Sequence, residues 1–142
     1  MLWTRRKFVR LAPCALCVTS GFVATQAGAQ NAPAAATAGV SRKILSQMDG
    51  PAPGYVTLVV EATIDAGVPV ARHTHPGIES GHVMEGGFEL PVQGQETRML
   101  KAGDTFQIPP GTPHAGGKPG PAKTTILITY VVEKGKPLAS PA

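Results

Sequence analysis

Apolar and polar residues alternate with a period of two over much of this 142-residue chain. Between Tyr55 and Ile64 every second residue is apolar and the residues between them are mostly polar, which is the pattern of a half-buried strand. Thr124 to Glu133 repeats this pattern. Shorter segments of the same kind lie between the two, separated by turns rich in glycine and proline, and none has a convincing helical periodicity. We therefore predict an all-β domain, either a sandwich or a barrel.

The first 29 residues have a different pattern, that of an export signal. Thr4–Arg10 is basic, Leu11–Val23 is mostly apolar, and Ala27–Ala29 has the small residues that signal peptidase cuts after. The apolar run is shorter than the roughly 20 residues that a membrane-spanning helix needs, so we expect no permanent anchor. The paired Arg5 and Arg6 favour a twin-arginine signal, and an ordinary secretory signal is the alternative. We expect the mature protein in the periplasm or outside the cell.

The predicted boundaries divide the chain into four parts. Residues 1–29 are the signal peptide, and residues 30–54 are a flexible lead-in in which Val40–Met48 could be a short strand or a helical turn. Residues 55–134 hold the alternating segments, and residues 135–142 are a tail that we expect to be frayed. About 113 residues remain after cleavage, which is enough for one domain with a single core.

Removing the signal changes the charge and the cysteine content of the protein. Four of the 13 basic residues and none of the nine acidic residues lie in the first 29, so nine of each remain. The calculated excess of positive charge belongs to the signal, and we expect neither nucleic acid nor an anionic membrane as a partner. Both cysteines, Cys14 and Cys17, are also removed. The mature chain therefore has no disulfide.

Three histidines and one glutamate form a candidate metal site. His73 and His75 are two residues apart, so on a strand both imidazoles leave the same face about 7 Å apart along the chain. The break at Pro76–Gly77 can turn Glu79 back towards them. His114 would have to come from a distant segment. Three imidazoles and a carboxylate suit Mn, Fe, Ni, Cu or Zn, whereas calcium prefers oxygen ligands throughout.

The residues around these four resemble the two motifs of the cupin superfamily. The first motif, G-x5-H-x-H-x3-E-x6-G, is filled by Gly67, His73, His75, Glu79 and Gly86. The second, G-x5-P-x-G-x2-H, is filled by Gly103, Pro109, Gly111 and His114. The asparagine that ends the second motif is replaced by Lys118. This resemblance implies a small jelly-roll β-barrel that brings ligands from two hairpins together inside.

The resemblance also implies one divalent transition metal held by His73, His75, Glu79 and His114. Similar cupins keep open coordination positions, and a closed four-ligand zinc site is the structural alternative. The implied activity is that of a quercetin-dioxygenase-like oxygenase, with an enolisable or phenolic small molecule as substrate and Glu79 as the group that accepts its proton.

Other functions would use the same residues. One alternative is a metal-dependent sugar or uronate isomerase, hydrolase or lyase, which needs no oxygen. Another is a protein that binds a small ligand or a metal without catalysis. Similar small cupins often pair through their sheets, so the chain could form a homodimer.

The remaining polar residues near the motifs receive weaker assignments. His82 is expected on the opposite strand face from Glu79, Glu85 at a solvated hairpin tip, and Lys118 in solvent. Four further residues on apolar positions could line a pocket above the metal, although packing in the core is their default role: Phe106, Ile108, Ile126 and Tyr130.

Overall fold

A computed structural model describes residues 38–142, so the predicted signal peptide and the first part of the lead-in, residues 30–37, lie outside the described residues. Within residues 38–142 the chain forms strands and no helix, and therefore no helix that is long and apolar enough to cross a membrane. The strands are β1 (Val40–Asp49), β2 (Tyr55–Ile64), β3 (Val70–Thr74), β4 (Gly77–Glu85), β5 (Gly87–Leu90), β6 (Arg98–Lys101), β7 (Thr105–Ile108), β8 (His114–Gly116), β9 (Thr124–Glu133) and β10 (Ser140–Pro141).

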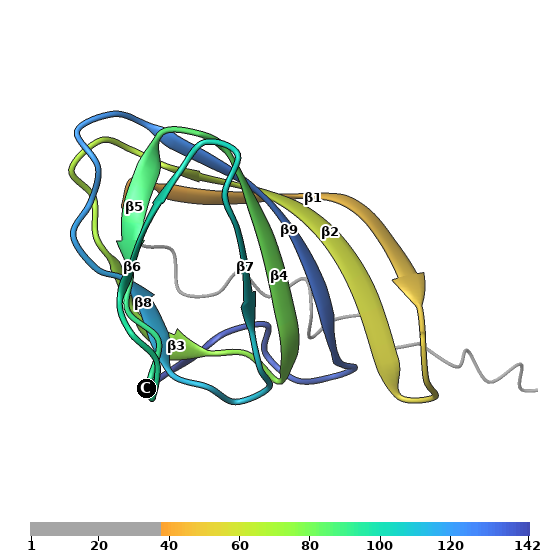
Figure 1. The fold of residues 1–142 in the computed structure, drawn as a ribbon. Coiled ribbons are helices and arrows are strands. Elements are labelled where there is room, and N and C mark those ends of the chain that lie inside the picture. The colour runs from red at the N-terminus through yellow and green to blue at the C-terminus, as the bar shows by residue number, and fades with distance from the viewer. Residues whose placement is uncertain (1–37) are drawn as a thin grey trace, which may run out of the picture.

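The strands form two facing layers (Figure 1). One layer is a curved five-stranded sheet with the order β1-β2-β9-β4-β7. The other contains the three-stranded sheet β10-β3-β8 and the two-stranded ribbon β5-β6. Single bridges from Phe88 to Pro119 and from Val92 to His114 connect the ribbon to the segment around β8. All strand pairs are antiparallel, and the fold is the predicted jelly-roll type.

The core lies between the two layers and is built by the alternation in the sequence. β2 and β9 pair over their whole length, from Tyr55 opposite Glu133 to Ile64 opposite Thr124. In both strands every second residue is buried, because a regular strand sends alternate side chains to opposite faces. A register slip of one residue would expose the whole apolar set, so this pattern fixes the pairing.

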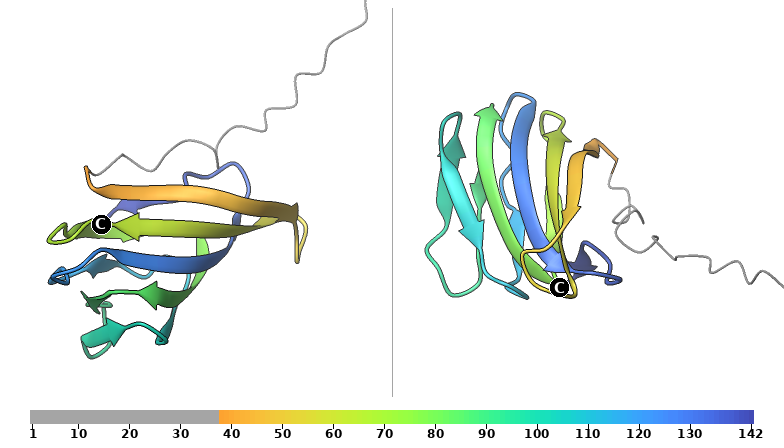
Figure 2. Two further views of the ribbon diagram at one scale, coloured as in Figure 1. Left: turned by 90° about the horizontal axis from the view of Figure 1, so that it is seen from above. Right: turned by 90° about the vertical axis from the view of Figure 1, so that its right-hand side faces the viewer.

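Several predicted segments agree with the structure, and two predictions are resolved or corrected. β2 and β9 have the predicted bounds. Val40–Met48, for which a strand and a helical turn were both open, lies in the edge strand β1 beside β2. The expectation of a frayed tail is wrong, because β10 pairs with β3 and Leu138 is buried in the core. Figure 2 shows the described C-terminal end lying beside the sheets. Leu138 is the one large apolar residue of this tail, and burying it offsets the entropy lost on ordering the segment.

Candidate metal centre

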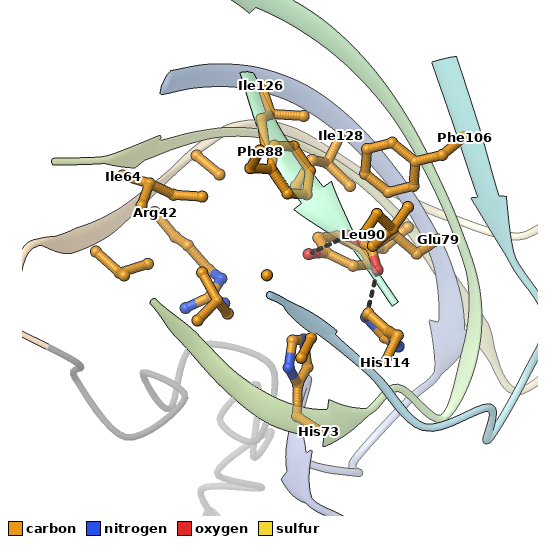
Figure 3. Close-up of a pocket in the computed structure, with 16 residues that line it drawn as sticks. Arg42, Ile64, His73, Glu79, Phe88, Leu90, Phe106, His114, Ile126 and Ile128 are labelled. Carbon is orange, nitrogen blue, oxygen red and sulfur yellow. Dashed lines mark hydrogen bonds and ion pairs between the residues drawn. The ribbon is translucent and has the colours of Figure 1, made fainter. Parts of the chain in front are cut away.

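The candidate metal residues come from both layers: β3 and β8 pair with each other in one layer, and β4 lies in the facing five-stranded sheet. His73 in β3 is directly opposite His114, the first residue of β8. His75 follows the end of β3, and Glu79 lies in β4, directly opposite Tyr130 of β9. Residues directly opposite each other in antiparallel strands place their side chains on the same face, so these two pairs point inward together. Figure 3 shows His73, Glu79 and His114 around a common space.

The side chains converge closely. One ligand nitrogen from each of the three histidines lies within 4.8 Å of the others. The Oε2 atom of Glu79 is 3.2 Å from Nε2 of His75 and 3.0 Å from Nε2 of His114. His75, Glu79 and His114 are buried, and His73 is partly buried. The sequence prediction that these four residues meet therefore agrees with the geometry.

Backbone carbonyls orient all three imidazole rings. In each histidine Nδ1 lies against a carbonyl oxygen, which can only accept, so Nδ1 carries the proton that it donates. In a neutral imidazole the other nitrogen, Nε2, then keeps a free lone pair directed into the site. Metal-binding histidines use this arrangement, because the outer hydrogen bond fixes both the ring and its tautomer. The acceptors are the carbonyls of Ala71 for His73 at 2.8 Å, Leu138 for His75 at 2.5 Å and Thr112 for His114 at 2.9 Å.

Three buried atoms at the centre of this cluster make no hydrogen bond within the described residues. They are Nε2 of His75, Nε2 of His114 and Oε2 of Glu79. Although the oxygen is within ion-pair distance of both nitrogens, all three present lone pairs to one another when the histidines are neutral. Two ligands held about 2.1 Å from one ion at a right angle lie about 3.0 Å apart, close to the separations here. The donor set therefore fits a divalent transition metal.

The pKa values follow from burial and from these contacts. Burial lowers the pKa of His73 to about 4, so its ring is neutral at pH 7. Burial alone would raise the pKa of Glu79, but His114 and His75 hold it well below its usual value. Burial alone would lower the pKa of His114, but the contact with Glu79 raises it above its usual value. Glu79 is therefore a carboxylate in the folded protein, which is the form that a metal binds.

Tyr130 supports the outer oxygen of Glu79. Its hydroxyl donates a hydrogen bond of 3.2 Å to Oε1, the carboxylate oxygen that does not face the two nitrogens. Burial raises the pKa of Tyr130 well above its usual value, and the negative charge of Glu79 adds to this. The hydroxyl thus stays protonated as a donor. Tyr130 also lies against His75, with the ring centres 4.8 Å apart.

A cavity of about 50 Å³ adjoins these residues. This is several times the roughly 10–15 Å³ that one water molecule needs, so a small ligand can enter. The predicted pocket residues Phe106, Ile126 and Tyr130 line the cavity, whereas Ile108 is buried in the core and does not. Most of the wall is apolar, and it is formed by Val40, Ala62, Ile64, Val70, Phe88, Leu90, Phe106, Ala115, Gly116, Ile126 and Ile128.

Arg42 of β1 also lines the cavity, and the sequence analysis did not identify it. Its sequence signal is weak, because it is a single arginine in a segment whose secondary structure was ambiguous. Three other polar residues lie outside the site. His82 and Glu85 are exposed, as expected, and Lys118 is exposed while its backbone amide donates to Glu89.

Comparison with known proteins identifies the family. A family model described as a cupin domain matches residues 60–131, about half of the chain. The chain belongs to the cupin family. The predicted superfamily is therefore confirmed, while the quercetin-dioxygenase-like subtype stays a prediction. No curated protein matches this cupin.

Solved structures resemble this cupin at low sequence identity. KdgF from Halomonas sp. is 28% identical with a TM-score of 0.53, and the match covers 66% of this chain and 82% of KdgF. A protein with a double-stranded β-helix domain from Klebsiella pneumoniae is 23% identical with a TM-score of 0.55, covering 70% and 82%. The DMSP lyase DddQ from Ruegeria pomeroyi is 22% identical with a TM-score of 0.56, covering 61% of this chain and 43% of that one. The chain thus matches less than half the length of the lyase. The latter two likenesses concern the fold alone.

Proposed function

We propose that this cupin is a metal-dependent oxygenase that acts on a small enolisable or phenolic substrate. His73, His75, Glu79 and His114 are its metal ligands, and dioxygen is its second substrate. The observation that carries the proposal is the position of the converging donor atoms, which border a mostly apolar cavity.

Each part of the site has a role in this reaction. A bound divalent metal would act as a Lewis acid that polarises a substrate oxygen. The backbone carbonyls at Nδ1 keep each Nε2 directed inward. Glu79 accepts the proton of the substrate hydroxyl, while Tyr130 donates a hydrogen bond to Oε1 of Glu79. The apolar wall excludes water from the substrate anion formed in this way.

The composition of the wall favours this substrate class over a sugar. The cavity lining has only five residues with polar or charged side chains, and three of these are candidate metal ligands: Arg42, His73, Glu79, His114 and Tyr130. A sugar carries several hydroxyl groups that would lose hydrogen bonds to water on entering, and each unpaired group costs about 1–3 kcal/mol. A substrate with one or two polar groups and an apolar body loses less.

One observation supports the alternative, a metal-dependent isomerase or lyase. Glu79, one of the candidate metal ligands, and Tyr130 form a buried pair of a base and an acid. Such a pair can move a substrate proton without an oxidant. The two proposals therefore differ in whether the reaction consumes oxygen.

Oxygen uptake by metal-loaded protein tests the proposal. We expect uptake with at least one member of a panel of flavonols, 1,3-diketones and dihydroxyaromatics, and none in His75→Ala. His82→Ala is the matched control, because this exposed histidine lies outside the site. Product formation at an equal rate without oxygen would favour the alternative. Absence of any turnover in protein that binds metal would indicate a binding protein.

We also propose that the chain is exported and cut after Ala29. The basic, apolar and small-residue segments of the first 29 residues support this. Mass spectrometry of protein from the periplasm should find a chain that begins at Gln30. Substitution of Arg5 and Arg6 by lysine should retain the protein in the cytoplasm if the twin-arginine route is used, and should leave export unchanged if the signal is an ordinary secretory one.

A further inference from the structure

Among the described residues that line the cavity, Arg42 is the only one other than histidine with a side chain that can be positively charged. It lies in β1 directly opposite Ala62 of β2, whose side chain is buried in the core. Opposite residues share a face, so Arg42 points inward, while its neighbours Ser41 and Lys43 are exposed. A register shift between Ile44 and Ser46 ends this regular pairing two residues later. Figure 3 shows Arg42 directed into the cavity.

Among the residues that the structure describes, the guanidinium of Arg42 has no carboxylate partner. Within residues 38–142 none of the ion pairs involves it. Glu79 is the single acidic residue of the lining, and both of its oxygens are already engaged by Tyr130 and by the histidine cluster. Arg42 does reach the hydroxyl of Tyr130, where its charge and a side-chain hydrogen bond both oppose the rise in the pKa of Tyr130. A half-buried cation on an apolar wall is costly unless an anion pairs with it.

The rest of the wall defines what this anion must look like. Arg42 and the donor cluster share the lining with Tyr130 and with aliphatic and aromatic side chains, including Ile64, Phe88 and Ile128. A ligand that spans this space therefore has a charged end and an apolar body. Guanidinium groups bind planar carboxylates through two parallel N–H···O hydrogen bonds.

We propose that Arg42 is the carboxylate-binding residue of this cavity, and that the substrate is a small monocarboxylate with an apolar body. Its carboxylate pairs with Arg42, and its enol or phenol oxygen lies at the candidate metal centre. This inference rests on the proposed function for the role of the second oxygen. The binding of a carboxylate by Arg42 is independent of the reaction.

Arg42 lies outside residues 60–131, the part of the chain that the cupin family model matches. The candidate metal ligands all lie inside it. The specificity of the site for acidic substrates would therefore come from an edge strand outside the matched segment, and the candidate metal centre from inside it.

Binding of matched charged and neutral ligands tests this assignment. The ligands are benzoate with benzamide, and the smaller butyrate with butyramide. Their dissociation constants are measured by NMR titration of isotope-labelled protein, both metal-free and loaded with zinc. We expect each carboxylate to bind at least about tenfold more tightly than its amide. Arg42→Met should weaken carboxylate binding about 10- to 100-fold, because hydrogen bonds to charged groups are lost, and should change amide binding less than about twofold.

Lys43→Met is the matched control, since it removes the adjacent positive charge on the exposed face of the same strand. We expect both affinities to stay unchanged in this variant. Arg42→Lys retains the charge without the planar fork, and we expect about tenfold weaker carboxylate binding. The NMR spectrum shows whether each variant is folded. If Arg42→Met does not fold, Arg42→Lys still tests the role of Arg42.

Equal binding of acid and amide by the wild-type protein would overturn the assignment. Retention of the preference in Arg42→Met, or an equal loss in Lys43→Met, would overturn it too. These outcomes are separable from the proposed function. If the protein prefers carboxylates but shows no metal binding or oxygen uptake, the proposed oxygenase function is wrong and the role of Arg42 stands. If it consumes oxygen but does not prefer carboxylates, the role of Arg42 is wrong and the oxygenase function stands.

Discussion

The segment of residues 60–131 and the strands that flank it contribute different things to the same site. The central segment supplies the three histidines and Glu79, whose donor atoms face one point. The flanking strands supply groups around that point, namely Arg42 from β1 and the carbonyl of Leu138 next to β10. Changes in the central segment should therefore remove the candidate metal site, and changes in the flanks should adjust it.

The largest expected effect comes from removing a candidate metal ligand of the central segment. His114→Ala deletes a buried Nε2 from the donor cluster, so affinity for Zn²⁺ or Mn²⁺ should fall roughly 100-fold or more. Competition with a chelator measures this affinity. His82→Ala is the control and should bind as the wild type does. Wild-type affinity in His114→Ala would mean that the cluster is not the metal site.

Removal of the C-terminal flank should have the next largest effect. A chain ending at Lys136 loses the buried Leu138 and the carbonyl that accepts from Nδ1 of His75. We expect metal affinity to fall about 10- to 100-fold, because the ring of His75 is no longer oriented.

Leu138→Ala separates orientation from packing in this flank. It keeps the backbone carbonyl but removes a side chain that is 6% exposed, so it should cost about 2–4 kcal/mol of the free energy of unfolding. Its metal affinity should stay within about threefold of the wild type. Urea unfolding of metal-free protein and chelator competition measure the two quantities. A loss of affinity as large as that of the truncated chain would show that packing, and not the carbonyl, positions His75.

Tyr130→Phe should have a smaller effect within the central segment. It removes the hydrogen bond to Oε1 of Glu79 and keeps the ring against His75. One hydrogen bond makes a net contribution of about 0.5–1.5 kcal/mol, so metal affinity should decrease by up to about tenfold. Calorimetric titration with metal measures the change. An effect as large as that of His114→Ala would place Tyr130 among the groups that bind the metal directly.

The smallest effect is expected at Glu85, which the sequence predicted to lie at a solvated hairpin tip. Glu85 is exposed at the end of β4. Glu85→Gln should change the free energy of unfolding by less than about 0.5 kcal/mol and leave metal affinity unchanged. Thermal unfolding with and without metal checks both. Any clear loss of metal affinity would show that the hairpin tip takes part in the site.

The long strands and the donor set were predictable from the sequence, and the surroundings of the donors were not. β2 and β9 were predictable because each has ten residues that alternate between apolar and polar, so that one face of the strand is buried. β1 was ambiguous since most of it is exposed at the edge of the sheet, where burial imposes no alternation. The tail was mistaken for a frayed end because a two-residue strand leaves no periodic signal, and its order depends on the place of Leu138 in the core.

The sequence by itself determined the fold class, the family and the four residues that converge, because these depend on strand periodicity and on fixed spacings within short segments. The tertiary structure alone decided which carbonyl orients His75, that Tyr130 holds Glu79, and that Arg42 enters the cavity. The first two contacts join residues 63 and 51 positions apart, and Arg42 faces the cavity through its pairing with Ala62, 20 positions away. Such contacts arise from the register between strands and from burial, and neither leaves a local trace in the chain.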